Sequence, residues 1–274
     1  MKGIIAVDLF CGAGGLTRGL LDAGIKVVKG FDINPKFKKT YEKNNPGVSF
    51  ISKDVSLLNK QEILDKIDIK DRYFLLAGCA PCQPFSAINK QSLREDSRKS
   101  LLLEFGRLVE ETQPNFIFIE NVPGLATGRG ERIFEEFKKK LDAMRYFYIY
   151  RVVDAKTYGV PQTRKRLILI ASNQGPIDFP QETHGNGKSL TRYTTVRYAI
   201  SKYPVIRDGS KHEKIPNHET RSLSEINRQR MNFIKRDGGS RKELPAELKL
   251  ECHKKHEGHT DVYGRMKWNN VAPT

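Results

Sequence analysis

The sequence predicts an α/β fold, a doubly wound and mostly parallel sheet, followed by a smaller irregular region. Two observations support this. Through residues 1–172, apolar strand-like runs alternate with amphipathic helix-like stretches, and a glycine-rich turn joins the first run to the first helix. From residue 173 onward, Gly, Pro, Asn, Thr and Tyr dominate without a sustained period. We therefore expect two domains, 1–172 and 173–274.

Strands in the larger domain are predicted as short apolar runs bounded by turn residues. They cover Ile4–Phe10, Val27–Asp32, Val48–Ser52, Tyr73–Ala77, Phe116–Glu120, Tyr146–Val153 and Leu167–Ala171. Strands that alternate with helices form parallel sheets covered on both faces. Ligands bind such sheets beyond the carboxyl ends of the strands.

Helices are predicted where apolar residues recur at intervals of three and four, as Leu101, Phe105 and Leu108 do. The expected helices are Gly15–Ala23, Pro35–Asn44, Lys60–Lys66, Ser97–Thr112 and Arg132–Met144. The smaller domain offers one helix, Ser224–Ile234, then a turn at 237–240 and a short stretch at Pro245–Leu250.

The composition limits the class of protein. The chain has 274 residues, 38% of them apolar, which is enough for a substantial core. Its 48 basic and 32 acidic residues give a net charge of +16, which favours a polyanionic partner, nucleic acid before a membrane. No apolar run is long enough to span a bilayer, and the N-terminus is no signal peptide because it runs into the glycine-rich turn. Four scattered cysteines indicate reduced thiols, hence a cytoplasmic protein.

Acidic residues follow three successive predicted strands. The first strand leads through Asp8 into Phe10-Cys11-Gly12-Ala13-Gly14-Gly15, where glycines allow a ligand to approach the main chain. Asp32 closes the second strand and is suited to accept both hydroxyls of a ribose. Asp54 follows the third strand and is placed to accept from an adenine amino group. The pattern G-A-G-G-L-T lacks the dinucleotide signature G-x-G-x-x-G, so we expect a different adenosine-containing ligand.

Residues 78–86, GCAPCQPFS, follow the fourth predicted strand and leave three interpretations open: a redox pair, half of a metal site, or one nucleophile in a rigid turn. Pro84 disfavours the helix that a thioredoxin-like pair needs. A zinc site would need two more ligands, and no second Cys-x-x-Cys exists. The run from Cys252 to His259 is another metal candidate, but Gly258 weakens the helix that would gather its side chains. We expect no metal.

Taken together, the motifs resemble those of the DNA (cytosine-5) methyltransferase family, in its bacterial restriction–modification form. DLFCGAGG is similar to the family's S-adenosylmethionine loop and GCAPCQPFS to its nucleophile loop. Glu120-Asn121-Val122 resembles the ENV motif, and QTRKR at 162–166 resembles QxRxR. The stretch 264–274 is similar to the late RxxW..PxxT segment. The resemblance runs from Asp8 to Thr274.

The resemblance implies methyl transfer from S-adenosylmethionine to carbon 5 of cytosine, in a specific sequence of double-stranded DNA and on a base flipped out of the duplex. Cys82 would add to carbon 6 as a thiolate, which is nucleophilic near neutral pH. Glu120, as a neutral acid, would hold N3 and the amino group. Arg164 and Arg166 would hold O2, the catalytic loop or a phosphate. Residues 87–98 are similar to the family's mobile loop.

The residues expected to hold the cofactor share one position, the carboxyl ends of the first four predicted strands. They are Asp8, Phe10, Gly12, Gly14, Gly15, Leu16, Asp32, Ile33, Asp54, Val55 and Pro81. Base recognition is expected between about 173 and 260, where side chains would meet the major groove. Residues 217–240 resemble restriction–modification members, which favours DNA over transfer RNA.

Family members continue past the PxxT segment into a last motif that returns to the larger domain, whereas the printed sequence ends at Thr274. Besides an enzyme, we therefore expect as an alternative a DNA- and cofactor-binding subunit of a split methyltransferase, completed by a second polypeptide. A third alternative, an NAD-type oxidoreductase using Cys79 and Cys82, is disfavoured by the missing G-x-G-x-x-G signature.

Overall fold

The computed structural model describes residues 2–81, 101–254 and 262–274. The chain forms two compact units, each described here by itself. Unit 1 comprises Met1–Val153 and Lys165–Pro180, and unit 2 comprises Asp154–Arg164 and Gln181–Thr274. Residues 154–164, which precede the last strand of the sheet, thus group with unit 2.

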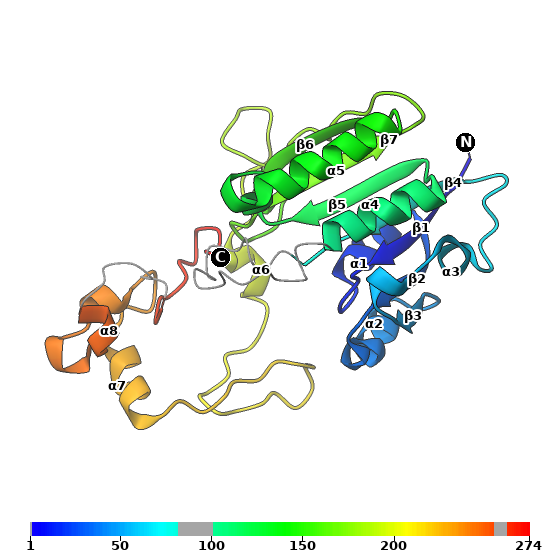
Figure 1. The fold of residues 1–274 in the computed structure, drawn as a ribbon. Coiled ribbons are helices and arrows are strands. Elements are labelled where there is room, and N and C mark those ends of the chain that lie inside the picture. Colours follow the sequence, from blue (N-terminus) through cyan, green and yellow to red (C-terminus); the bar gives the residue numbers. More distant parts are fainter. Residues whose placement is uncertain (1, 82–100, 255–261) are drawn as a thin grey trace. The chain divides into compact units, whose positions relative to one another are not determined.

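Unit 1 is built on a seven-stranded sheet with the order β3-β2-β1-β4-β5-β7-β6 (Figure 1). The strands are β1 Ile4–Leu9, β2 Lys26–Asp32, β3 Ser49–Ser52, β4 Tyr73–Gly78, β5 Phe116–Asn121, β6 Phe147–Asp154 and β7 Lys165–Ser172. β1 to β5 are parallel to their neighbours, and β7 runs antiparallel to β5. The predicted α/β architecture is confirmed, and each predicted strand overlaps an observed one.

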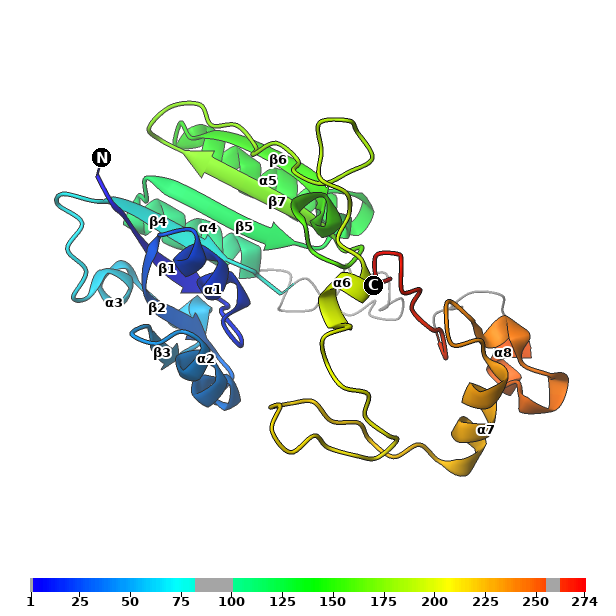
Figure 2. The ribbon, with the colours of Figure 1, turned by 180° about the vertical axis from the view of Figure 1, so that it is seen from behind.

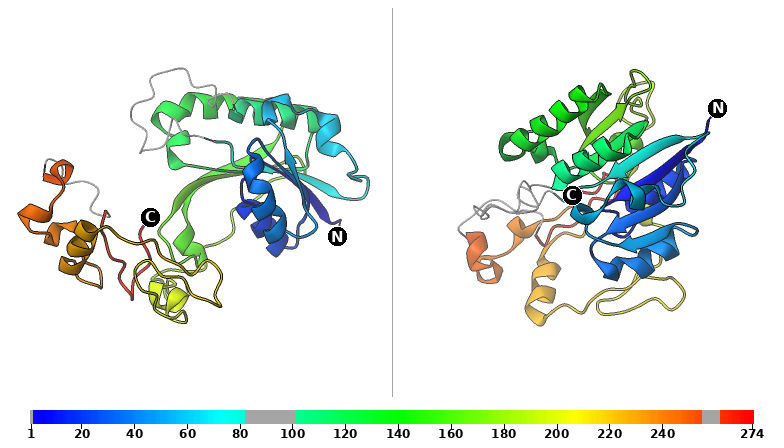
Figure 3. Two further views of the ribbon diagram at one scale, coloured as in Figure 1. Left: turned by 90° about the horizontal axis from the view of Figure 1, so that it is seen from below. Right: turned by 45° about the vertical axis from the view of Figure 1, so that its right-hand side comes forward.

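Helices cover both faces of this sheet (Figures 2 and 3). They are α1 Gly15–Asp22, α2 Lys38–Asn44, α3 Lys60–Leu64, α4 Leu101–Thr112 and α5 Glu131–Ala143. Side chains of β1 alternate between the faces, as period-2 geometry requires. Val7 packs in one apolar core with Phe105 and Phe137 of α4 and α5, whereas Ala6 packs in a second core with Leu20 and Tyr41 of α1 and α2.

The strand order reverses between β1 and β4, because the chain first builds outward through β2 and β3 and then returns to the other side of β1. Such a reversal leaves a crevice at the carboxyl ends of the two central strands, where α/β sheets bind their ligands. The glycine-rich turn follows β1 at this edge, and the segment 78–81 follows β4.

Unit 2 contains little regular structure. Its helices are the short α6 Val196–Ile200, α7 Glu225–Phe233 and α8 Glu251–Lys254, of which only α7 was predicted. Ile234, Leu244 and Leu248 form a small buried cluster. Among the described residues, no helix is both long and apolar enough to cross a membrane.

Candidate active site

The turn after β1 has an unusual main-chain conformation. Phe10, Gly12 and Gly14 have φ angles of 57°, 50° and 90°. Gly14 is required on two grounds: φ lies in the left-handed region, and a Cβ there would collide with the side chains of Asn45 and Tyr41. The turn therefore brings the chain sharply from β1 into α1 and keeps the main chain of residues 12–15 free of side chains.

Asp32 fixes this turn from the neighbouring strand. Its Oδ2 accepts from the Gly12 amide at 2.9 Å, and its Oδ1 accepts from the Asn34 amide at 2.8 Å. The next residue, Ile33, is 65% exposed although it is large and apolar. A carboxylate beside an exposed aliphatic side chain suits a ligand that has hydroxyls next to a flat apolar ring.

Asp54 occupies the equivalent place after β3. Its Oδ1 accepts from the Ser56 amide at 2.9 Å and caps the 3₁₀ turn η2, Val55–Leu57. Val55 is buried, which anchors the turn in the core of unit 1. In the described part of the chain, Asp54 Oδ2 accepts no hydrogen bond, so it remains able to accept from a ligand.

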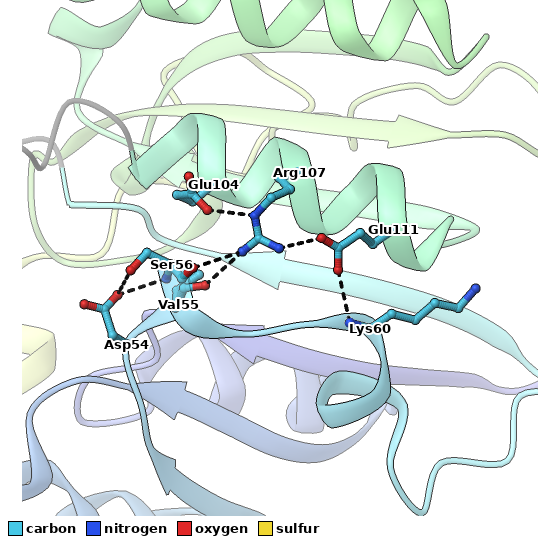
Figure 4. Close-up of polar contacts among 7 residues, drawn as sticks. All are labelled: Asp54, Val55, Ser56, Lys60, Glu104, Arg107 and Glu111. Carbon is cyan, nitrogen blue, oxygen red and sulfur yellow. Dashed lines mark hydrogen bonds and ion pairs between the residues drawn. The ribbon is translucent and has the colours of Figure 1, made fainter.

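Arg107 of α4 fastens η2 to the helix layer (Figure 4). Its guanidinium pairs with Glu104 at 2.8 Å and Glu111 at 2.5 Å, and donates to the carbonyls of Val55 and Ser56 at 3.5 and 3.4 Å. Glu111 in turn accepts from the Lys60 amide at 3.1 Å. This cluster, named the Arg107 clamp, therefore sets the position of η2 and of the Asp54 carboxylate. Sequence analysis did not identify it, although Glu104, Arg107 and Glu111 are spaced for one helix face.

Asp8 is fully buried below the turn. Its Oδ2 accepts from Thr17 Oγ1 at 2.7 Å, and Thr17 Oγ1 lies 2.9 Å from the Tyr41 hydroxyl. Its Oδ1 is buried without a partner in the described structure. Burial raises the pKa of Asp8 from 3.8 to about 7, partly offset by the Thr17 hydrogen bonds. The contacts shown link β1 to α1 and α2; binding of cofactor by Asp8 stays a prediction.

The end of β4 is closely packed. A Cβ on Gly78 would lie 2.9 Å from both the Leu9 carbonyl oxygen and a ring carbon of Phe105, so only glycine fits there. Burial, followed by the nearby Asp8 and Glu120 carboxylates, raises the pKa of the Cys79 thiol above its usual value, so Cys79 is a protonated thiol. Pro81 is the last described residue before the gap. The predicted nucleophile, Cys82, lies outside the described residues.

Glu120 ends β5 next to this turn. Its carboxylate is paired with Arg166 Nε of β7 at 2.8 Å, and both side chains remain partly exposed. The neighbouring Asn121 is buried and donates from Nδ2 to the Ala80 carbonyl at 3.0 Å. Asn121 was quoted from the sequence only as part of a motif, and the structure shows that it ties β5 to the segment preceding Cys82.

The two predicted arginines differ. Arg166 lies in β7 and contacts Glu120, but Arg164 precedes the strand and belongs to unit 2. The Arg164 amide donates to Asp154 Oδ1 at 3.0 Å, and its side chain is exposed. In residues 2–81, 101–254 and 262–274, no three His, Cys, Asp or Glu side chains are placed to hold a metal. His256 and His259 of the second metal candidate lie outside the described residues.

Comparison with known proteins identifies the family. Residues 4–274 match the model of the C-5 cytosine-specific DNA methylases. The type II methylase M.HgiDII of Herpetosiphon aurantiacus is 39% identical over 98% of this chain and 74% of its own, and M1.HphI of Haemophilus parahaemolyticus is 32% identical over 89% and 64%. A prophage-encoded E. coli protein of known structure is 25% identical and has a TM-score of 0.69, covering 99% of this chain and 82% of its own. The chain belongs to the family of C-5 cytosine-specific DNA methylases.

Proposed function

We propose that this protein transfers a methyl group from S-adenosylmethionine, the cofactor of C-5 DNA methyltransferases, to carbon 5 of cytosine in double-stranded DNA. The observation that carries the proposal is one edge of the unit 1 sheet. There the Gly12 turn, Asp32 and Asp54 lie at successive strand ends, and the Glu120–Arg166 pair lies beside the segment that leads to Cys82. The chain spans 74% and 64% of the two relatives, so its activity needs its own test.

The first three strand ends fit S-adenosylmethionine. Asp32 has lone pairs left to accept the ribose hydroxyls after its two main-chain bonds. Ile33 offers an apolar surface to the adenine ring, and Asp54 Oδ2 is available for the adenine amino group. When bound, the cofactor supplies an electrophilic methyl group. Leu16, Val55 and Pro81 complete the expected cofactor contacts.

The residues of the chain activate the cytosine. The Cys82 thiolate adds to carbon 6, so that the electron pair of the 5,6 double bond becomes available at carbon 5. Glu120 holds N3 and the exocyclic amino group, and Arg166 holds the Glu120 carboxyl group in place. After methylation the proton on carbon 5 is removed and the thiolate leaves, which restores both the base and the enzyme. Arg164 contacts the base O2 or a phosphate.

A cytosine inside a duplex is out of reach of Cys82, so the base is flipped into the pocket. The net charge of +16 supports binding to the DNA backbone, and the irregular segments of unit 2 are suited to contact base edges in the major groove. The recognition sequence is read by this second region.

Radiolabelled methyl transfer into plasmid DNA tests the function. The wild-type chain should label DNA, Cys82→Ala should abolish labelling, and Cys79→Ser should retain most of it because the Cys79 thiol stays protonated. Loss of labelling in Cys79→Ser with full activity in Cys82→Ala would overturn the proposal. If the wild type binds DNA and cofactor without transfer, the chain instead behaves as the subunit of a split methyltransferase that the sequence analysis named as an alternative.

A further inference from the structure

Unit 2 contains a groove that no catalytic residue described above occupies. Its volume is about 960 Å³, and it lies between the loop 185–195 and the segment 269–271, with Thr163 between them. The loop is closed by two main-chain hydrogen bonds, Gly185 N to Thr191 O at 2.8 Å and Thr191 N to Thr183 O at 3.0 Å. The groove is thus a structured feature of the surface and not a gap between loose ends.

The groove is positively charged. Lys188 and Arg192 line it, both are exposed, and no Asp or Glu is among its lining residues. Within the described part of the chain, neither cation has an ion-pair partner, a hydrogen-bonding side-chain acceptor or an aromatic ring beneath it, whereas Lys211 and Arg228 of the same unit are paired with carboxylates. Two unpaired cations without a nearby carboxylate favour an anionic ligand.

Uncharged donors also line the groove. The side chains of Asn186, Asn269 and Asn270 are amides, and Asn269 Oδ1 accepts from Arg197 Nε at 2.8 Å, which leaves its amino group as the free end. Among the described residues, the main-chain amides of Asn186 through Ser189 donate to no acceptor. Successive free amides beside cations form the type of concavity that binds phosphate oxygens.

A neighbouring depression of about 370 Å³ extends this surface. It shares Thr163, Asn270 and Val271 with the groove and adds Arg265 and Lys267. The basic and amide groups therefore form a continuous track and not a single pocket, which fits a polymer of phosphates better than one small anion.

We propose that the groove lined by Lys188 and Arg192 binds backbone phosphates of the DNA substrate, independently of base sequence. This inference rests on the proposed function, because it assigns one contact surface for the same DNA. Phosphate contacts fix the register of a protein on the duplex without reading bases. Lys188 and Arg192 are thus positioning residues for DNA and not part of the chemistry.

The test is the salt dependence of binding to two fluorescent duplexes, one of random sequence and one containing the methylated site. Replacing both cations, Lys188→Ala with Arg192→Ala, should lower the slope of log affinity against log salt by about 1.8, at about 0.9 per phosphate contact. The loss of affinity should be the same for both duplexes, and kcat at saturating DNA should not change. The charge-retaining pair Lys188→Arg with Arg192→Lys should keep the wild-type slope.

The matched control is Lys139→Ala, which removes an exposed lysine without an ion pair from α5 of unit 1 and should leave the slope unchanged. A second variant, Asn186→Asp, puts a carboxylate into the groove and should weaken binding to both duplexes. An unchanged slope in the double variant, or a loss confined to the duplex with the methylated site, would overturn the inference. A wild type that binds DNA but never methylates it would contradict the proposed function while leaving the slope comparison intact.

Discussion

The two units of the chain hold their functional side chains by different means. In unit 1, an apolar core lies on each face of the sheet, and strand ends and buried contacts fix Asp32, Asp54 and Glu120. In unit 2, one small cluster is buried, and caps and side-chain hydrogen bonds such as Ser240–Glu243 organise the loops. The difference indicates that the chemistry is built on a rigid scaffold, whereas DNA contact is built on exposed loops that share little packing.

The largest effect should come from the core of unit 1. Phe137→Ala removes a fully buried ring that packs edge-on against Phe105, with centroids 6.2 Å apart, and should lower the free energy of unfolding by about 3–5 kcal/mol. Leu244→Ala in the small cluster of unit 2 should cost less and leave cofactor affinity unchanged. Urea unfolding combined with calorimetric titration of S-adenosylmethionine measures both.

Equal losses of stability in the two variants, or loss of cofactor binding in Leu244→Ala alone, would show that the two units depend on one packing network. That result would remove the contrast between a packed scaffold and an exposed contact region.

Glu120→Gln compares a charged pair in each unit. It keeps the shape of the side chain but loses the acid, so single-turnover methyl transfer should fall about 10²–10⁴-fold without a change in cofactor affinity. Glu219→Gln breaks the exposed pair with Lys211 in unit 2, whose atoms lie 3.7 Å apart, and should have little effect. Comparable activity of wild type and Glu120→Gln would contradict the role given to Glu120.

Two aspartates should give opposite pH dependence. Because burial raises the pKa of Asp8 from 3.8 to about 7, its contribution to stability is greatest below pH 3.8 and is lost as pH rises toward 7. The loss is up to about 4 kcal/mol, and Asp8→Asn should remove it. Asp208 of unit 2 has a lowered pKa because of Arg228 and Leu223 hydrogen bonds, so its contribution is present above pH 3.8 and lost as pH falls. Urea unfolding between pH 4 and 8 checks both; a wild-type slope in Asp8→Asn would show that another group titrates.

Arg107→Gln should have the smallest effect, about a tenfold weaker binding of S-adenosylmethionine, because it releases η2 from α4. Arg107→Lys should restore only part of the affinity, since an ammonium cannot replace the guanidinium fork. Lys140→Gln is the matched control, because it breaks the pair between Lys140 and Glu110 at 2.8 Å without contacting η2. Equal binding losses in Arg107→Gln and Lys140→Gln would mean that the clamp acts only through general stability.

Much of unit 1 was predictable because its information is local. Period-2 and period-3.6 apolar patterns identified its strands and helices, and Asp32 and Asp54 were expected at strand ends, where they lie. The Arg107 clamp was not predictable, because it joins segments that are about 50 residues apart through carbonyl groups that carry no sequence signal. The Asn121–Ala80 bond escaped for the same reason.

Unit 2 was less predictable, because capping and hydrogen bonding between distant loops hold it together. Helix α6 has five residues and α8 has four, too short for a periodic signal. The groove around Lys188 and Arg192 is formed by a loop and by residues 269–271, about 80 positions later, so no local pattern marks it. The expected second polypeptide and the recognition sequence stay predictions.

The central claim is that Cys82 forms a covalent bond to the target cytosine in a chain that is active by itself. DNA in which 5-fluorocytosine replaces cytosine tests it directly, because fluorine at carbon 5 blocks the last elimination. With S-adenosylmethionine present, the wild-type chain and Cys79→Ser should both give a denaturation-resistant protein–DNA adduct, and Cys82→Ala should give none. An adduct that persists in Cys82→Ala would contradict the account.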